Sequence, residues 1–259
     1  MTVSAGIDAG METMKIVILK DEKILYRTIV PIGAESVSAV AERHLVQATK
    51  ETGISLDELH CIGGTGANAD DIPFIQKRLS ETICSPLGIY WLFSQVHTVL
   101  DAGAGHFMVL KCKQGKTMKI VRGDKCASGV GISLRMASNV LGIQVQDMSQ
   151  IARKSEEEVV ITSTCSVFAE SEIISLVHAK KKPEDIVKGV FRGLASRLYS
   201  LLLNIGIEDD VGMIGGMANC EGIVEMIEDM SGHKILVPSD PATVGALGAA
   251  LAVLDGDKY

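Results

Sequence analysis

Two short segments of the sequence place an aspartate before a glycine turn at the expected end of a β-strand. Asp8 precedes Ala9-Gly10 in residues 8–13, the first corner, and Asp101 precedes Ala102-Gly103 in residues 101–106, the second corner. Carboxylates can hold Mg²⁺ or orient a water molecule, and closely approaching backbone N–H groups can bind the oxygens of a nucleoside triphosphate. Either corner alone is better explained as an aspartate that caps a turn. Together they make Asp8 and Asp101 candidate catalytic residues of a nucleotide site.

Further residues near the corners fit the same chemistry. Ile214-Gly215-Gly216 is a third glycine turn that can admit a nucleoside, and Lys15 can add positive charge near the phosphates. His106 can touch phosphate, although a histidine in a turn is more often a surface residue. The chain has no P-loop and no dinucleotide-binding glycine motif after its first expected strand. Their absence argues against a P-loop fold and against a Rossmann fold. The candidate nucleotide-binding residues at this point are Gly10, Lys15, Gly103, His106, Gly215 and Gly216.

Two of the six cysteines, Cys126 and Cys165, lie in small or polar segments just before expected helices. Helix N-termini lower the pKa of a thiol and favour negative charge, as a thiolate ligand of an iron–sulfur cluster requires. A core thiol or a catalytic nucleophile explains such residues as well. A four-cysteine cluster would need two more ligands from a second chain. The remaining cysteines fit packing better, and they are Cys61, Cys84, Cys112 and Cys220.

Composition excludes several classes of protein. The 259 residues are 47% hydrophobic and 22% charged, with a formal net charge of −7, enough for one large domain or two modest ones. The negative net charge, together with basic residues that are scattered and not clustered, argues against nucleic-acid binding. We expect no membrane span, because no apolar run is long enough, and no secretory signal, because the start lacks a basic and then apolar region. The expected location is the cytoplasm, where disulfides are rare.

The elements that position these residues occur twice. Strands are predicted over residues 4–8, 14–20 and 24–31, and again over 97–101, 107–113 and 118–122, so that each corner joins the first two strands of its set. This echo predicts two related α/β halves. Helices are predicted from apolar spacing and end signals, over residues 36–52, 132–141, 166–178, 183–204, 223–230 and 243–251.

With these motifs in place, the chain resembles the BadF/BadG/BcrA/BcrD ATPase family over nearly its whole length. The resemblance rests on residues 6–10 with Lys15, 99–103, 124–131, 163–172, 215–216 and 244–250. It implies an α/β fold of two ribonuclease-H-like domains, of the actin, Hsp70 and sugar-kinase type, with a nucleotide cleft between them. The implied domains are residues 1–95, completed by a C-terminal helix within 243–259, and residues 96–242, which carry the cluster cysteines.

The resemblance also implies cofactors and partners. The cofactors are Mg-ATP and one [4Fe–4S] cluster shared between two homologous ATP-binding subunits, with Cys126 and Cys165 as this chain's ligands. ATP hydrolysis in such proteins drives a low-potential electron to acyl-CoA reductase or dehydratase subunits, and a ferredoxin or flavodoxin-like protein is the implied electron donor. Cluster potential responds to solvent exposure and hydrogen bonding, so nucleotide and cluster need not touch.

Two departures from the family pattern guide the choice of function. The first corner has Met11-Glu12 where Ser or Thr is usual, which leaves Thr13 as its nearest hydroxyl and adds it to the candidate nucleotide-binding residues. The second corner ends in Ala104-Gly105-His106, whereas dehydratase activators typically read Asp-x-Gly-Gly-Gln-Asp there. We therefore expect an ATP-binding subunit of the benzoyl-CoA reductase of anaerobic aromatic degradation. The alternatives are a homodimeric activator of a 2-hydroxyacyl-CoA dehydratase, a cluster-free small-molecule kinase of this fold, and a binding module without turnover.

Overall fold

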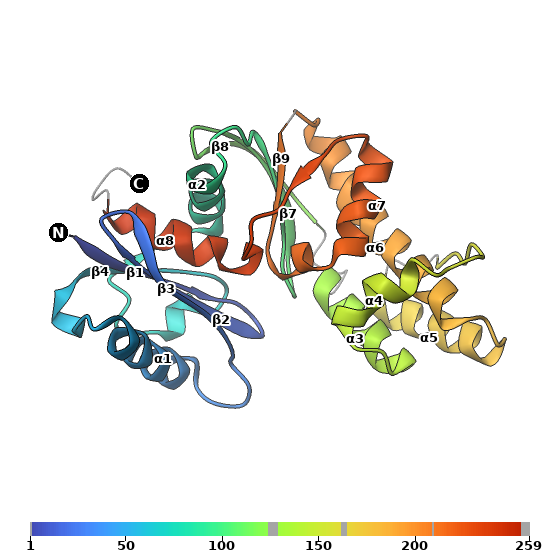
Figure 1. Ribbon diagram of the computed structural model, residues 1–259, viewed down its shortest axis with the longest axis horizontal. Coiled ribbons are helices and arrows are strands. Elements are labelled where there is room, and N and C mark those ends of the chain that lie inside the picture. The colour runs from blue at the N-terminus through green and yellow to red at the C-terminus, as the bar shows by residue number, and fades with distance from the viewer. Residues whose placement is uncertain (1, 124–128, 162–164, 209, 255–259) are drawn as a thin grey trace.

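The computed structural model describes residues 2–123, 129–161, 165–208 and 210–254, and it contains two mixed β-sheets joined by helices (Figure 1). The first sheet has the order β3-β2-β1-β4-β5, in which β1 is antiparallel to β2 and parallel to β4. Its strands are β1 (Val3–Ala9), β2 (Thr13–Lys20), β3 (Lys23–Pro31), β4 (Leu59–Thr65) and β5 (Lys77–Arg78). The helix α1 (Val37–Thr52) packs on this sheet, and two short 3-10 helices, η1 (Leu56–Glu58) and η2 (Ala69–Asp71), flank β4.

The second sheet repeats the first. Its order is β10-β9-β6-β7-β8, so that its central strand β6 is again antiparallel to the next strand and parallel to a later one. The two α/β halves predicted from the echo of the corners are therefore confirmed. The strands are β6 (Thr98–Ala102), β7 (Phe107–Lys113), β8 (Lys116–Arg122), β9 (Val211–Ile214) and β10 (Ile235–Leu236).

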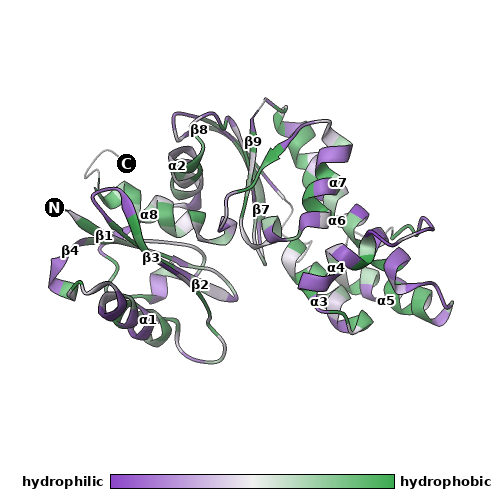
Figure 2. Ribbon diagram, viewed as in Figure 1, coloured by the Kyte–Doolittle hydropathy of each residue, from purple (hydrophilic) through white to green (hydrophobic). Residues whose placement is uncertain are grey.

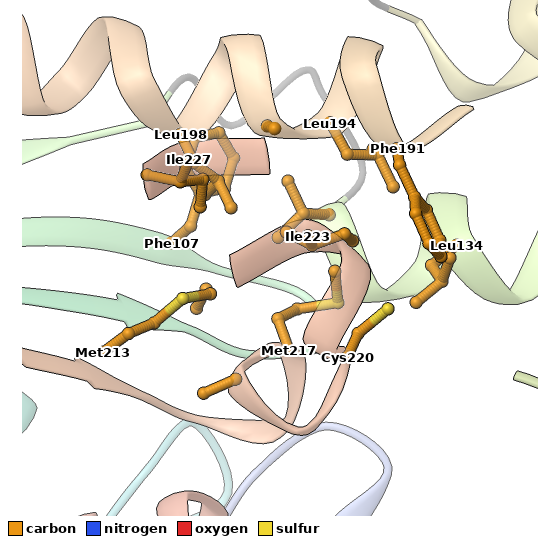
Figure 3. Close-up of a cluster of buried hydrophobic side chains, with 14 of the residues drawn as sticks. Phe107, Leu134, Phe191, Leu194, Leu198, Met213, Met217, Cys220, Ile223 and Ile227 are labelled. Atoms are coloured by element: carbon orange, nitrogen blue, oxygen red, sulfur yellow. The ribbon is translucent and has the colours of Figure 1, made fainter. Parts of the chain in front are cut away.

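Most of the remaining helices belong to the second half. The long helix α6 packs on β7 and α7, and α3, α4 and α5 form a helical layer at the far end of the molecule (Figure 1). Phe191, Leu194 and Leu198 of α6 meet Ile223 and Ile227 of α7 in the largest apolar core (Figure 3). The helices are α3 (Val130–Leu141), α4 (Val145–Ala152), α5 (Ser166–His178), α6 (Pro183–Ile205), η3 (Gly216–Asn219), α7 (Glu221–Ser231) and η4 (Pro241–Thr243).

Two helices, α2 (Glu81–Leu92) and α8 (Val244–Leu254), cross between the sheets (Figure 1). Their backbones touch at glycines: a Cβ on Gly248 would lie 1.9 Å from the carbonyl oxygen of Cys84, and one on Gly88 would lie 2.3 Å from that of Val244. The small residues predicted to allow such an approach are present in α8, whose sequence is VGALGAALAVL. The helix is largely hydrophobic (Figure 2). α8 packs on β1, β2 and β4, so the end of the chain returns to the first sheet, while the domain boundaries at residues 95 and 242 stay predictions.

The sequence did not predict α2, and its residues explain why. Pro86 and Gly88 lie inside the helix, and α2 is buried between two sheets, so it lacks a one-sided apolar stripe. Proline has no N–H to donate to the carbonyl oxygen of Thr82, and the hydroxyl of Thr117 donates to that oxygen instead, at 2.5 Å. No helix among the described residues combines the length and apolarity that crossing a bilayer requires.

Candidate functional site

The two corners are built alike. Each is a tight turn between the first two strands of its sheet, and each is closed by a backbone hydrogen bond from its glycine. The N–H of Gly10 donates to the carbonyl oxygen of Thr13 at 3.1 Å, and the N–H of Gly103 donates to that of His106 at 2.9 Å. In each half, the aspartate therefore lies near the end of a strand, directly before the glycine turn.

The Asp8 carboxylate lies close to two glycines, Gly66 and Gly245, and beside the cation of Lys15. Lys15 is its partner across β1 and β2, with Nζ 3.3 Å from Oδ2. A Cβ on Gly66, which has φ +92°, would lie 2.5 Å from Asp8 Oδ1, and one on Gly245 would lie 3.3 Å from Oδ2. Burial raises the pKa of Asp8 and the charge of Asp101 adds to the rise, while Lys15 opposes it. The carboxylate is thus short of positive charge.

Asp101 is buried and is held by a hydroxyl from α2. Ser85 Oγ donates to Asp101 Oδ2 at 2.6 Å. His106 Nε2 lies 3.8 Å from Asp101 Oδ1 and 3.5 Å from Glu81 Oε1. Burial also raises the pKa of Glu81, with His106 opposing and the charges of Asp101 and Asp8 adding to the rise. The carboxylates of Asp8, Glu81 and Asp101 are therefore close enough for their charges to interact, and positive charge from a bound ligand would reduce that repulsion.

All nine residues predicted for catalysis and nucleotide binding line one cleft between the two halves. They are Asp8, Gly10, Thr13, Lys15, Asp101, Gly103, His106, Gly215 and Gly216. The sequence missed other lining residues, of which Glu81 and Ser85 lie on the unpredicted helix α2 and Arg135 lies on α3. A carboxylate and a hydroxyl spaced four residues apart, on one face of a helix, would have been the signal for the first two.

The other end of the cleft is apolar and open at one glycine. Gly215 has φ +86°, and a Cβ there would lie 2.3 Å from the carbonyl oxygen of Ala102, whereas a Cβ on Gly216 would meet nothing within 4 Å. Met217 connects this wall to the apolar core (Figure 3). The side chains of this wall are Leu134, Val145, Met217 and Asn219. Three apolar side chains and one amide suit the binding of a nucleobase.

The cysteines that the structure describes differ in how deeply they are buried. Burial raises the pKa of the thiols of Cys84, to about 12, and Cys112, to about 11, and also that of Cys220, so these three are packing residues. Cys61 is partly buried against an apolar cluster. Cys165 is the N-cap residue of α5, partly exposed, and does not line the cleft.

Cys126 lies outside the described residues. Within the described ranges, no group of three or more His, Cys, Asp or Glu side chains is arranged to hold a metal ion. Arg197 of α6 is close enough to Cys165 for the thiol's charge to oppose the lowering of the Arg197 pKa that burial causes. The Arg197 guanidinium also lies 5.6 Å from the centre of the Phe107 ring.

The second corner and the first residue of β7 contact the chain on both sides of residues 124–128. Before them, the N–H of Gly123 donates to the carbonyl oxygen of Phe107 at 3.0 Å. After them, the N–H of Ile132 donates to the carbonyl oxygen of Ala104 at 3.2 Å, and a Cβ on Gly129 would lie 1.9 Å from that same oxygen. The residues on both sides of the segment that contains Cys126 are therefore in contact with the second corner or with the residue that follows it.

Comparison with known proteins gives the family. Residues 5–253 match the model of the BadF/BadG/BcrA/BcrD ATPase family. The chain is 34% identical to the 2-hydroxyisocaproyl-CoA dehydratase activator of Clostridioides difficile, over 98% of this chain and 95% of that protein. It is also 34% identical to the (R)-2-hydroxyglutaryl-CoA dehydratase activating ATPase of Acidaminococcus fermentans, over 95% of each. A benzoyl-CoA reductase subunit of Thauera aromatica is more distant, at 28% identity over 97% of this chain and 93% of that one.

Among the solved structures that superpose on the chain, two come from 2-hydroxyacyl-CoA dehydratase systems. Component A of the Acidaminococcus fermentans (R)-2-hydroxyglutaryl-CoA dehydratase superposes with a TM-score of 0.92 at 32% identity, covering 97% of both chains. The 2-hydroxyisocaproyl-CoA dehydratase activator with bound ADPNP follows at 0.91 and 32%, covering 98% of this chain and 95% of that one. A glucokinase of the ROK family from Streptomyces griseus, at 0.62 and 13%, covering 98% of this chain and 100% of that one, shares the fold alone. These similarities favour the dehydratase activators, which the sequence had ranked second, over the reductase subunit. The chain belongs to the BadF/BadG/BcrA/BcrD ATPase family.

Proposed function

We propose that this protein is an ATP-hydrolysing activator that delivers low-potential electrons to a 2-hydroxyacyl-CoA dehydratase. The proposal of nucleotide binding depends on one observation: the nine expected residues of the two corners and the third glycine turn all line one cleft. The higher identity to dehydratase activators than to the reductase subunit supports the choice of partner.

The residues of the cleft fit Mg-ATP. Asp8, Asp101 and Glu81 form an acidic group in which burial raises the pKa of Asp8 and Glu81, and a bound cation would relieve that burial cost. Bound Mg²⁺ would supply neutralisation of the phosphate charge. Lys15 adds a second cation on the side of the first corner.

The residues around Asp101 fit the orientation of an attacking water. Its Oδ2 is occupied by the Ser85 hydroxyl at 2.6 Å, which leaves Oδ1 for another donor. His106 lies 3.8 Å from that oxygen, within reach of the same water. Asp101 would thus orient the nucleophile, and Asp8 with Lys15 would hold the phosphates and metal.

Cys165 is one of the two cysteines that we propose this chain supplies as ligands of an iron–sulfur cluster. Its side chain is partly exposed at the start of the 13-residue helix α5, where the helix dipole favours negative charge, and the half-buried cation Arg197 lies nearby. The second proposed ligand, Cys126, lies outside the described residues. A [4Fe–4S] cluster would serve as the electron carrier, and two chains would have to supply its four thiolates. The proposed electron donor is a ferredoxin or flavodoxin-like protein.

The second corner offers a route from nucleotide to cysteine. Ala104 contacts the start of α3 and Phe107 contacts Gly123, so a corner that moves with the nucleotide moves both flanks of residues 124–128. Phe107 also stacks against Arg197, the cation beside Cys165. The flanks of residues 124–128 and the cation beside Cys165 therefore all contact residues 104–107, and such contacts would allow the nucleotide cleft to influence the cluster.

Two matched variants test this proposal. The protein is purified without oxygen, and iron content and ATP hydrolysis are measured on the same samples. Cys165→Ala is expected to lose most of its iron and retain its ATP affinity, whereas Asp101→Asn is expected to keep its iron and lose hydrolysis. Buried Cys112→Ala is the control for removal of a thiol. A Cys165→Ala protein with a full iron complement would contradict the cluster assignment.

A second candidate remains, because the second corner carries His106 beside Asp101 and Glu81 instead of the pattern typical of dehydratase activators. In that case the chain is an ATP-binding subunit of a benzoyl-CoA reductase and shares its cluster with a paralogous subunit. Anaerobic reconstitution of the chain alone separates the two. A brown homodimer supports the activator, and a colourless monomer that takes up iron only with a paralogue supports the reductase subunit.

A further inference from the structure

An ion pair crosses the mouth of the cleft between the two halves of the molecule. Glu12, in the turn of the first corner, pairs through its carboxylate with the guanidinium of Arg135 on α3. Both side chains line the cleft, and Arg135 is half-exposed while Glu12 is partly exposed. The pair thus lies at the site where a nucleotide would enter.

The same turn makes a second contact across the cleft. A Cβ on Gly105 would lie 1.9 Å from the sulfur of Met11, so the Met11 side chain rests directly on the backbone of the second corner. Glu12 therefore extends from a turn whose position is already set by Met11. The pairing of Glu12 with Arg135 follows from that placement.

The charged side chains that line the cleft favour Arg135 as a ligand of the nucleotide phosphates. Among the described side chains that line it, four are carboxylates, and the basic residues besides His106 are Lys15 and Arg135. Lys15 is engaged by Asp8. A guanidinium binds carboxylate and phosphate oxygens with the same forked geometry, so a polyphosphate in the cleft competes directly with Glu12.

We propose that Arg135 is a phosphate ligand of the nucleotide, supplied by α3, and that Glu12 occupies its guanidinium while the cleft is empty. The inference rests on nucleotide binding in the proposed function. It makes Glu12 a competitor of ATP, and it gives the two members of one ion pair opposite effects on nucleotide affinity.

Calorimetric titration with ATP and with adenosine, in the full chain, tests this assignment. Arg135→Gln is expected to weaken ATP binding about tenfold, since it removes one charge-assisted contact. Glu12→Gln is expected to tighten it roughly threefold, because an exposed pair contributes little and no longer has to be broken. Adenosine affinity is expected to stay unchanged in both. Arg135→Lys keeps the charge without the fork and should lie between wild type and Arg135→Gln.

The control is Arg153→Gln, which breaks a surface pair with Glu221 and Glu225 outside the cleft and should leave ATP affinity unchanged. If the ion pair served only to hold the halves together, Glu12→Gln and Arg135→Gln would change ATP affinity in the same direction, which would overturn the proposal. An equal loss for adenosine would overturn the assignment to phosphate. A wild-type chain that binds no ATP would instead refute the proposed function.

Discussion

The first and second corners share one scaffold and differ in what faces their aspartates. Each aspartate ends a central strand, precedes a turn closed by its glycine, and lies beside a strand that ends at a glycine of positive φ, Gly66 or Gly215. Across the hairpin, however, Asp8 faces Lys15, whereas Asp101 faces the uncharged Met108. The duplicated scaffold therefore presents one carboxylate beside a cation and one held by a hydroxyl.

This difference suggests a division of work between the halves. A carboxylate paired with lysine suits a place beside metal and phosphate, where charges must balance. A carboxylate fixed by Ser85 at 2.6 Å and approached by His106 suits the orientation of water. The fold supplies the symmetric frame, and the single differences at Lys15, Ser85 and His106 give each corner its role.

The largest expected effect separates the two aspartates. Asp101→Asn should lower kcat for ATP hydrolysis by a factor of about 10³, in the range found for removal of a group that activates a nucleophile, with little change in ATP affinity. Asp8→Asn should weaken binding of Mg-ATP as well as lower kcat. Steady-state hydrolysis together with titration of Mg-ATP distinguishes the two patterns. Identical effects on kcat and affinity in both variants would refute the division of work.

The shared scaffold predicts equal stability losses at the two strand-end glycines. Gly66→Ala and Gly215→Ala each place a Cβ against the carbonyl oxygen of the neighbouring strand, 2.6 Å from Ala9 and 2.3 Å from Ala102. Each should lower the free energy of unfolding by about 3 kcal/mol, as large backbone clashes do. Gly232→Ala is the control, because its φ is +70° but nothing lies within 4 Å, and it should cost only about 1 kcal/mol. Urea unfolding measures all three, and a loss confined to one half would contradict the shared scaffold.

The hydroxyl that holds Asp101 should have a smaller effect. Ser85→Ala removes a hydrogen bond to a buried carboxylate and should reduce kcat roughly tenfold, since a bond to a charged group contributes about 1.5–3 kcal/mol. Ser85→Thr, which keeps the hydroxyl, should restore most of the rate. If Ser85→Ala hydrolyses ATP at the wild-type rate, orientation of Asp101 by α2 is not needed for catalysis.

The smallest effect concerns the pH dependence of stability that the buried carboxyl of Asp8 causes. Burial raises the pKa of Asp8 above its ordinary value of 3.8, so the unfolded chain releases this proton at a lower pH than the folded chain does. The folded state therefore loses stability as pH rises from that value through the raised pKa. Without nucleotide and with EDTA present, the stability of Asp8→Asn should rise relative to wild type over this pH interval. The difference in Tm should reach roughly 2–4 °C at a pH where Asp8 is ionised in both the folded and the unfolded chain. A Tm difference that shrinks as pH rises would show that Lys15 compensates the charge fully.

Much of this site follows from local sequence, because each corner is a short motif between two strands with regular apolar patterns. The nine expected cleft residues all belong to such motifs. The contribution of α2 could not be predicted, since Pro86 and Gly88 conceal the helix and burial on both sides removes its amphipathic pattern. The pairing of Glu12 with Arg135 spans 123 residues and depends on how the halves meet, which no local pattern encodes.

The most direct test of the account is ATP-dependent activation of a partner enzyme. The reduced protein is mixed without oxygen with a 2-hydroxyacyl-CoA dehydratase, and dehydration of the 2-hydroxyacyl-CoA is followed with and without ATP. Product is expected with wild type and ATP, and none is expected with Asp101→Asn or Cys165→Ala. Activation by wild type without ATP, or by Cys165→Ala, would contradict it.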